Sequence, residues 1–169
     1  MIELAQFQAP EIDYRGLSPL FATLGGSVAV LMVGLFRGRF VQRILVPALG
    51  ASALLIAIGF TIANWESGDS APISEGALAI DTVALFMSML FYLAGLVTIV
   101  LSLRAAVTHE VGSGEYLCLL LGSVSGMVIL AAAENLVTLF LGLELLSIPL
   151  YVLCAGRVRH ARSLEAGLK

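Results

Sequence analysis

Five apolar stretches, each about twenty residues long, follow one another along the chain with short polar connections between them. A helix of that length crosses the hydrocarbon core of a bilayer, because each residue advances a helix by about 1.5 Å. The chain is 59% hydrophobic and only 12% charged, which lies outside the range of ordinary soluble domains. We therefore predict an all-α membrane protein, a multi-pass transmembrane helix bundle with about five complete spans and the start of a sixth. The predicted spans are residues 17–36, 44–64, 81–103, 115–133 and 136–155, and the sixth helix starts after Arg162.

The connections between these spans alternate in charge. Acidic residues gather in the connection after the second span, whereas arginines follow the first, third and fifth spans. Positively charged connections stay on the inner side of a membrane. We therefore expect the N-terminus outside and the last complete span to run from outside to inside. The seven arginines that carry this argument are Arg37, Arg39, Arg43, Arg104, Arg157, Arg159 and Arg162.

One carboxylate, Glu144, lies in the middle of the last complete span. On a helix that turns by about 100° per residue, Ser147 and Tyr151 share nearly the same stripe, and apolar residues fill the other faces. An ionisable group inside a membrane is costly and marks a functional site. We predict that Glu144 belongs to a proton relay, with Ser147 and Tyr151 as a supporting polar stripe. The alternative is a structural carboxyl that hydrogen-bonds polar groups of neighbouring helices.

Pro149 follows Glu144 in the same span and cannot donate a hydrogen bond to the carbonyl group of Leu145. We expect a helix break or a loosened backbone there, where a kink or a water molecule enters. Asn135 and Asp81 stand at the predicted helix starts and favour N-terminal capping. Glu134 fits a solvated turn at the outer surface.

Lys169 is the only lysine in the chain, and Glu165 precedes it by four residues. That spacing is typical of a solvated ion pair on a helix surface. Lys169 also lies roughly 10 Å along the sixth helix from Arg162, which is far enough to bring it into the membrane. We therefore predict that Lys169 joins Glu144 in the relay, with the solvated pair as the alternative.

Motifs for cofactor chemistry do not stand out in the sequence. It has no glycine-rich phosphate loop, no nucleophile elbow and no basic patch interleaved with aromatic residues. Cys118 and Cys154 lie inside apolar spans without the spacing of a metal site, and we expect them to be buried thiols. We predict no metal site, no cofactor-binding residues and no nucleic-acid partner for this chain.

A resemblance to a known family rests on the second half of the sequence. The run EYLCLLLGSVSGMVILAAAENLVTLFLGLELLSIPLYVLCA begins at Glu115, and RSLEAGLK follows from Arg162. Both resemble subunit N of respiratory complex I, the proton-pumping NADH-quinone oxidoreductase, more than its sister antiporter-like subunits L and M. The third span, AIDTVALFMSMLFYLAGLVTIVLS, is similar in style. Before that span only hydropathy agrees.

The resemblance implies a function and an organisation. Subunit N is antiporter-like, with two inverted helix repeats, and its glutamate in this helix pairs with a lysine on a later helix. Residues 1–16 would then be an outer N-terminal leader, residues 17–103 the first three transmembrane helices, and residues 104–169 the start of the antiporter-like repeat. The chain would be the N-terminal portion of a proton-translocating subunit in the cell inner (plasma) membrane, coupling quinone reduction by its partners to proton transport through Glu144 and Lys169.

The same resemblance implies what the chain does not hold. It would bind no cofactor, because quinone, NADH, flavin and iron-sulfur clusters belong to partner subunits. Its partners would be antiporter-like subunit M, the small membrane subunits and the lipid bilayer. Most of the family's proton path would lie beyond Lys169, so the chain would not pump by itself. An alternative function is a subunit of a multisubunit cation/proton antiporter, and a third is a helical element that only packs against its neighbours.

Overall fold

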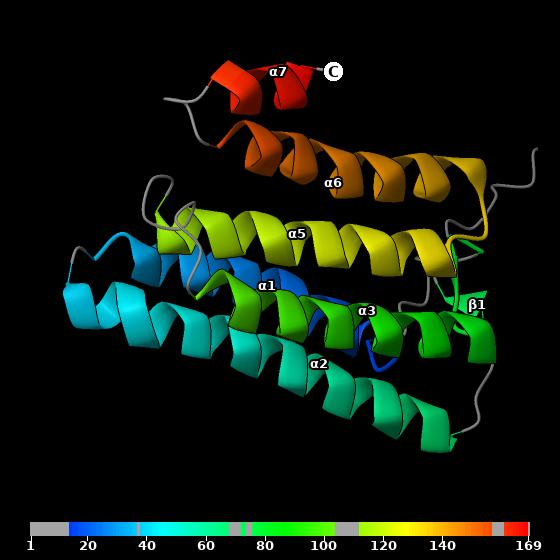
Figure 1. Cartoon of the computed structure of the whole chain (residues 1–169). Coiled ribbons are helices and arrows are strands. Elements are labelled where there is room, and N and C mark those ends of the chain that lie inside the picture. The colour runs from blue at the N-terminus through cyan, green and yellow to red at the C-terminus, as the bar shows by residue number, and fades with distance from the viewer. Residues whose placement is uncertain are drawn as a thin grey trace, which may run out of the picture.

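The computed structural model describes residues 14–36, 38–67, 72–73, 76–103, 112–156 and 161–168. Within these residues the chain forms helices that lie side by side with roughly aligned axes, and successive helices run in opposite directions (Figure 1). Residues 1–13 of the predicted leader and Lys169 lie outside the described residues. The helices are α1 (Ser18–Gly34), a π-helical segment η1 (Val41–Leu45) that continues into α2 (Val46–Ser67), α3 (Thr82–Ser102), α5 (Ser113–Ala132), α6 (Leu136–Ala155) and α7 (Ala161–Leu168).

The predicted class of a multi-pass helical membrane protein is confirmed. Four of the described helices are long and apolar enough to cross a membrane, and they include η1 joined to α2. The first predicted span, residues 17–36, differs from the structure. Helix α1 is apolar, but with 17 residues it is shorter than the predicted span and shorter than the four long helices. It ends at Gly34, two residues before the predicted limit, where the chain leaves the helix through a turn at Leu35. Gly34 is a point of close approach between α1 and α5, because a Cβ on it would lie 2.6 Å from the Cα of Gly114.

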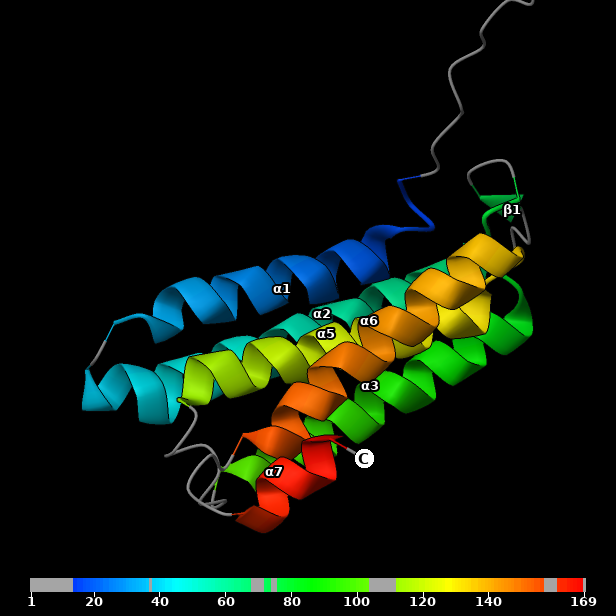
Figure 2. The same cartoon turned by 90° about the horizontal axis from the view of Figure 1, so that it is seen from above.

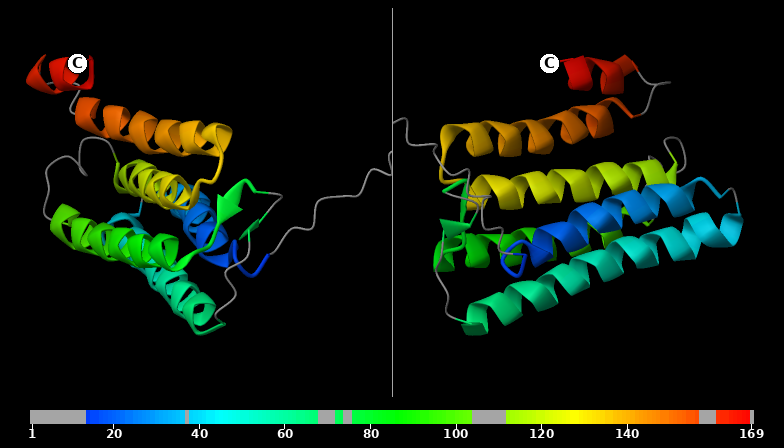
Figure 3. Two further views of the ribbon diagram at one scale, coloured as in Figure 1. Left: turned by 90° about the vertical axis from the view of Figure 1, so that its right-hand side faces the viewer. Right: turned by 180° about the vertical axis from the view of Figure 1, so that it is seen from behind.

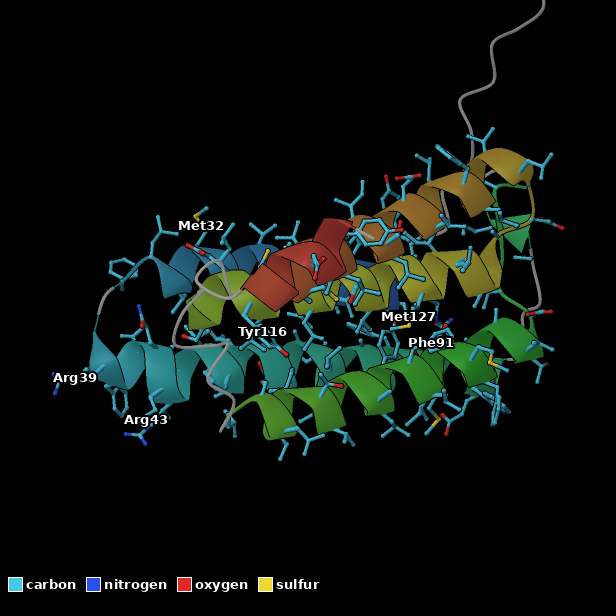
Figure 4. All side chains as sticks on the ribbon, turned by 45° about the horizontal axis from the view of Figure 1, so that its top comes forward. Met32, Arg39, Arg43, Phe91, Tyr116 and Met127 are labelled. Carbon is cyan, nitrogen blue, oxygen red and sulfur yellow. The ribbon has the colours of Figure 1, made fainter. Side chains whose placement is uncertain are left out.

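Helix α5 lies at the centre of the bundle. It contacts α1, α2 and α3 on one side and α6 on the other, and α7 lies beyond α6 (Figures 1 and 2). Leu121 and Val124 of α5 are almost fully buried among Leu54 of α2, Tyr92 of α3 and Val30 of α1. Figure 4 shows Met127 of α5 and Phe91 of α3 at the rim of this core. The outer faces carry large exposed hydrophobic side chains, as expected of helices that face lipid.

Two predicted helix starts are confirmed by their caps. The Asp81 side chain accepts a hydrogen bond of 2.7 Å from the backbone N–H of Ala84 at the start of α3. The Asn135 side chain accepts one of 2.8 Å from the N–H of Thr138 at the start of α6. Each cap satisfies a backbone donor that the first turn of a helix leaves free. Glu134, beside Asn135, is exposed as predicted.

The connection between α2 and α3 contains a small hairpin that the sequence did not predict. Strand β1 (Pro72–Ile73) pairs antiparallel with β2 (Leu78–Ala79). Leu78 also bridges Ala133, and the N–H of Glu134 donates to the carbonyl oxygen of Ala77 at 3.3 Å. The hairpin therefore ties the α2–α3 connection to the turn between α5 and α6 at one end of the bundle (Figure 3). Strands of two residues are too short to show an alternating pattern.

Candidate functional site

Helix α6 packs against α5 through small residues. A Cβ on Gly126 of α5 would lie 2.7 Å from the carbonyl carbon of Leu145, and a Cβ on Gly142 of α6 would lie 2.9 Å from the nitrogen of Leu130. Contacts that short exclude any larger residue, so both glycines let the two backbones touch. Gly142 and Pro149 are the buried residues of α6, and they define the side of the helix that faces α5.

Glu144 lies on the other side of α6. At about 100° per residue its direction is nearly opposite to that of Gly142 and Pro149. The side chain is half-buried, and among the described residues no hydrogen bond or ion pair reaches its carboxylate. The carboxylate therefore points away from the centre of the described bundle, toward a face that α1, α2 and α3 do not cover.

Ser147 and Tyr151 share this outward face. Ser147 Oγ donates a hydrogen bond of 2.7 Å to the carbonyl oxygen of Leu143 on the preceding turn, so its proton is used within α6. The Tyr151 side chain is 58% exposed. Since each hydroxyl group still has free acceptor positions on this face, both can accept hydrogen bonds from groups that cover it.

Pro149 does not break α6, which runs as one helix from Leu136 to Ala155. This differs from the predicted helix break. The proline ring lies on the side that faces α5, and its Cγ is 3.8 Å from the position of a Cβ on Gly122. The missing N–H of Pro149 still leaves the carbonyl group of Leu145 without its usual helix partner. A loosened backbone at this point stays a prediction.

Helix α7 begins on the same face of α6 as Glu144. Ser163 Oγ donates a hydrogen bond of 2.6 Å to the carbonyl oxygen of Cys154, and a Cβ on Gly167 would lie 3.2 Å from the carbonyl oxygen of Tyr151. Tyr151 is about two turns from Glu144 along that face. These contacts of α7 reach the Tyr151 end of the polar stripe, while Lys169 lies outside the described residues.

Helix α6 is the least enclosed of the four long helices. Of its membrane-spanning stretch 11% of the residues are buried, against 50% for α5. Cys154 of α6 is exposed and Cys118 of α5 is half-buried, so the prediction that both thiols are buried is wrong. Hydropathy cannot tell whether a side chain in an apolar span faces lipid or a neighbouring helix, because both surroundings are equally apolar.

Within the described ranges no group of three or more His, Cys, Asp or Glu side chains is placed to hold a metal ion.

The sequence did not predict a buried polar contact at the centre of the bundle. Ser125 Oγ of α5 lies 3.0 Å from Thr23 Oγ1 of α1 and hydrogen-bonds to it. Both residues are fully buried, and Tyr92 of α3 lies beside Thr23. Hydroxyl residues inside apolar spans are a known signal of helix contacts, but one sequence does not tell which helix each will meet.

Comparison with known proteins links this arrangement to a family. The sequence model described as NADH:quinone oxidoreductase/Mrp antiporter, TM, matches residues 133–169, which contain α6 and α7. NADH-quinone oxidoreductase subunit N 2 of Roseiflexus castenholzii is 35% identical over 99% of this chain and 33% of its own length. The resemblance to subunit N is confirmed. Subunit N of Chloroflexus aggregans is 32% identical over 95% of this chain and 32% of its own length.

The similarity to subunit N reaches further than the motifs indicated. The alignment with the Roseiflexus protein covers 167 residues, so the first two spans are related in sequence and not only in hydropathy. NAD(P)H-quinone oxidoreductase subunit 2 of Synechocystis is also similar, with 35% identity over 83% of this chain and 26% of its own length. The chain spans about one third of the length of the curated relatives that it matches first.

Proposed function

We propose that this chain forms part of a proton-translocating membrane subunit of an NADH-quinone oxidoreductase, which couples quinone reduction in partner subunits to proton transport. The observation that supports this proposal most directly is the position of Glu144. It lies mid-way along α6, inside the segment matched by the family model, on the face along which α7 begins. The enzyme would be a translocase, and this chain would contribute no redox centre. Quinone, NADH, flavin and iron-sulfur clusters would be held by its partners.

The proposed step is a change of protonation at Glu144. Opposite unit charges about 4 Å apart attract each other by about 4 kcal/mol at an effective dielectric constant of 20. The approach or withdrawal of a lysine ammonium group therefore decides whether the carboxylate holds a proton. Lys169, or a lysine on a later helix, would supply that charge. Ser147 and Tyr151 would hold water that connects Glu144 to the inner side.

The proposed orientation places the N-terminus outside a cell inner (plasma) membrane. Arg39 and Arg43 project at the end of the bundle where α2 starts (Figure 4), whereas Glu66, Asp81 and Glu134 lie at the opposite end with the hairpin. Arg15 at the hairpin end and Glu115 at the arginine end are exceptions, but the excess of arginine where α2 starts supports an inner position for that end. We further propose that residues 104–169 start the antiporter-like repeat, after a leader at residues 1–16 and three helices at residues 17–103.

The outward face of α6 supports the proposal that more helices complete the site. A half-buried carboxylate and an exposed tyrosine on a membrane helix are costly against lipid. Further helices of the same subunit, antiporter-like subunit M or the small membrane subunits would cover them. Lipid would cover the apolar outer faces of α2 and α3.

The decisive variant is Glu144→Gln in the full-length subunit, because it keeps the volume and removes the charge. We expect the complex to assemble and proton pumping in membrane vesicles to fall by about tenfold or more, with Glu144→Asp retaining part of the activity. Glu134→Gln is the matched control, since Glu134 is exposed at the end of the bundle. Normal pumping by the Glu144→Gln complex at normal expression would contradict the proposal and leave Glu144 as a packing residue.

A second candidate function is a subunit of a cation/proton antiporter, which the family description also names. Several curated relatives carry the name NADH-quinone oxidoreductase subunit N, which favours the first function. The two candidates differ in their partners. Purification of the tagged full-length subunit with flavin and iron-sulfur absorbance supports the oxidoreductase, and a membrane assembly without either absorbance supports the antiporter.

A further inference from the structure

A cavity lies at the arginine end of the bundle, between η1, the start of α2, the end of α3 and the start of α5. Its volume is ≈ 380 Å³, within the range of about 300–1,000 Å³ that is typical of ligand pockets. No acid is among the described residues that line it. The polar ones are Arg39, Gln42, Arg43, Ser102 and Ser113. The cavity is therefore large enough for a ligand and is lined by positive charge.

One wall of the cavity is built by the π-helical turn η1. In such a turn each carbonyl group accepts from the N–H five residues later, and the N–H of Val46 donates to the carbonyl oxygen of Val41. The same pattern would join Gln42 to Pro47, but proline has no N–H. Ser113 Oγ supplies the missing donor, because it hydrogen-bonds to the carbonyl oxygen of Gln42 at 3.0 Å. This bond holds the start of α5 against η1.

The donors of the cavity come from the same turn and the residues before it. Arg39 and Arg43 are exposed and lie at the opening, at the end of the bundle where α2 starts (Figure 4). Among the described residues no carboxylate forms an ion pair with either guanidinium group, and no hydrogen bond reaches the side chain of Gln42. Guanidinium and amide N–H groups are the donors that bind phosphate oxygens.

A carboxylate beside the cavity limits the charge that it can bind. A Cβ on Gly112 would lie 3.6 Å from the carboxyl carbon of Glu115, so this carboxylate lies over the first turn of α5. There it interacts with the positive end of the helix. Arg39 and Arg43 against this one carboxylate leave a single positive charge, which matches a phosphodiester better than a doubly charged phosphate.

Apolar side chains border the cavity on its outer side. Leu103 lines the cavity and is exposed, and Leu101 of α3 and Ile44 of η1 are exposed beside it in sequence. A soluble anion gains nothing from such a border, because it has no apolar part to bury. A lipid has a phosphate group for the donors and acyl chains for the apolar side chains.

We propose that this cavity binds an anionic glycerophospholipid, whose phosphodiester group accepts hydrogen bonds from Arg39, Gln42 and Arg43. The acyl chains lie along the outer faces of α2 and α3. Basic pockets between membrane helices bind anionic headgroups in this way. The site rests on the part of the proposed function that places lipid against α2 and α3. It does not depend on the role of Glu144, so loss of pumping and loss of lipid binding are separate results.

The first test measures how lipid protects a cysteine in the cavity of the purified, delipidated complex. Leu103→Cys is introduced into the full-length subunit together with Cys118→Ser and Cys154→Ser. Its reaction with a maleimide is followed on this subunit, separated by gel, while phosphatidylglycerol is added in detergent. We expect phosphatidylglycerol to slow the reaction. Leu136→Cys, at an exposed position at the opposite end of the bundle, is the control for unspecific shielding.

The arginines are then tested in the same assay. We expect the half-saturating concentration of phosphatidylglycerol to rise by about fivefold in Arg39→Gln or Arg43→Gln and by about 30-fold in the double variant. Arg15→Gln is the matched control, because Arg15 lies at the hairpin end of the bundle. If the double variant does not assemble, the two single variants decide.

Three outcomes contradict the proposal. Equal protection by phosphatidylcholine would mean that the cavity takes lipid without regard to charge. Protection by inorganic phosphate alone, at the same concentrations, would mean a site for a soluble anion. An unchanged half-saturating concentration in the arginine variants, or no protection of the Leu103→Cys variant, would mean that no headgroup binds at Arg39 and Arg43.

The second test is a cryo-EM map of the complex in nanodiscs that contain phosphatidylglycerol. We expect density for a phosphate group within hydrogen-bonding distance of Arg39, Gln42 and Arg43 that continues into acyl chains along α2 and α3. The proposal is wrong if the cavity is well resolved and empty, or if protein side chains fill it. Isolated phosphate density without acyl chains would also overturn it in favour of a soluble anion.

Discussion

Pro149 of α6 packs against Gly122 of α5, with its Cγ 3.8 Å from the position of a Cβ on that glycine. One turn further along α5, Gly126 lies against the backbone of Leu145 and Leu146. The stretch of α6 that lacks a hydrogen bond because of Pro149 is therefore covered by the glycine face of α5, and not by lipid. The weakened backbone faces protein while the carboxylate of Glu144 faces the other way.

This close packing predicts that α5 does not tolerate a side chain at Gly126. A Cβ there would lie 2.7 Å from the carbonyl carbon of Leu145, so the helices must separate. We expect Gly126→Ala to destabilise the subunit by about 1–3 kcal/mol, measured as heat stability of the purified complex. Gly59→Ala is the matched control, because a Cβ on Gly59 meets nothing within 4 Å. Equal effects of the two variants would refute close contact at Gly126.

Lys169 is predicted to act in the relay and not in a surface pair with Glu165. In the full-length subunit, we expect Lys169→Ala to lower the protons pumped per electron while assembly and quinone reduction stay near normal. Glu165→Gln removes the other member of the pair, and Glu165 is exposed. The surface pair is the better interpretation if both variants pump as the unchanged complex does.

The charge distribution predicts a topology that labelling can measure. In a background with Cys118→Ser and Cys154→Ser, single cysteines are introduced by Arg39→Cys and Glu134→Cys, both at exposed positions. A membrane-impermeant maleimide added to intact cells should label the Glu134→Cys variant only, and permeabilised cells should show both. Labelling of the Arg39→Cys variant alone in intact cells would mean that the orientation is inverted.

The cap of α3 predicts a local loss of stability. Asp81→Ala removes the acceptor of the 2.7 Å hydrogen bond from Ala84, and we expect a loss of about 1 kcal/mol in the free energy of unfolding. Asp81→Asn keeps an acceptor and should recover most of that loss. Thr82→Ala, at the next exposed position, is the control in the same heat-stability assay. A loss in the control as large as in Asp81→Ala would exclude the cap as the cause.

Local features of the sequence determined where the helices lie. The predicted span at residues 136–155 coincides with α6, and the sequence predicts both capped helix starts, at Asp81 and Asn135. Such features depend on residues that are close in sequence, since a cap acts within one turn and the hydropathy of a span is set by about 20 consecutive residues. The position of Glu144 in the middle of a membrane helix also follows from the sequence, as does the stripe that it shares with Ser147 and Tyr151.

Only the tertiary structure decided which face of each helix meets a neighbour. In water, the apolar side of a helix predicts its contacts, but in a membrane lipid is as apolar as leucine and the pattern loses that information. The contact of Gly126 with α6, the outward direction of Glu144 and the buried hydroxyl group of Tyr92 all depend on how helices pair. Small residues let two backbones approach, but the sequence does not name the partner helix, because the pairing joins residues far apart in the chain.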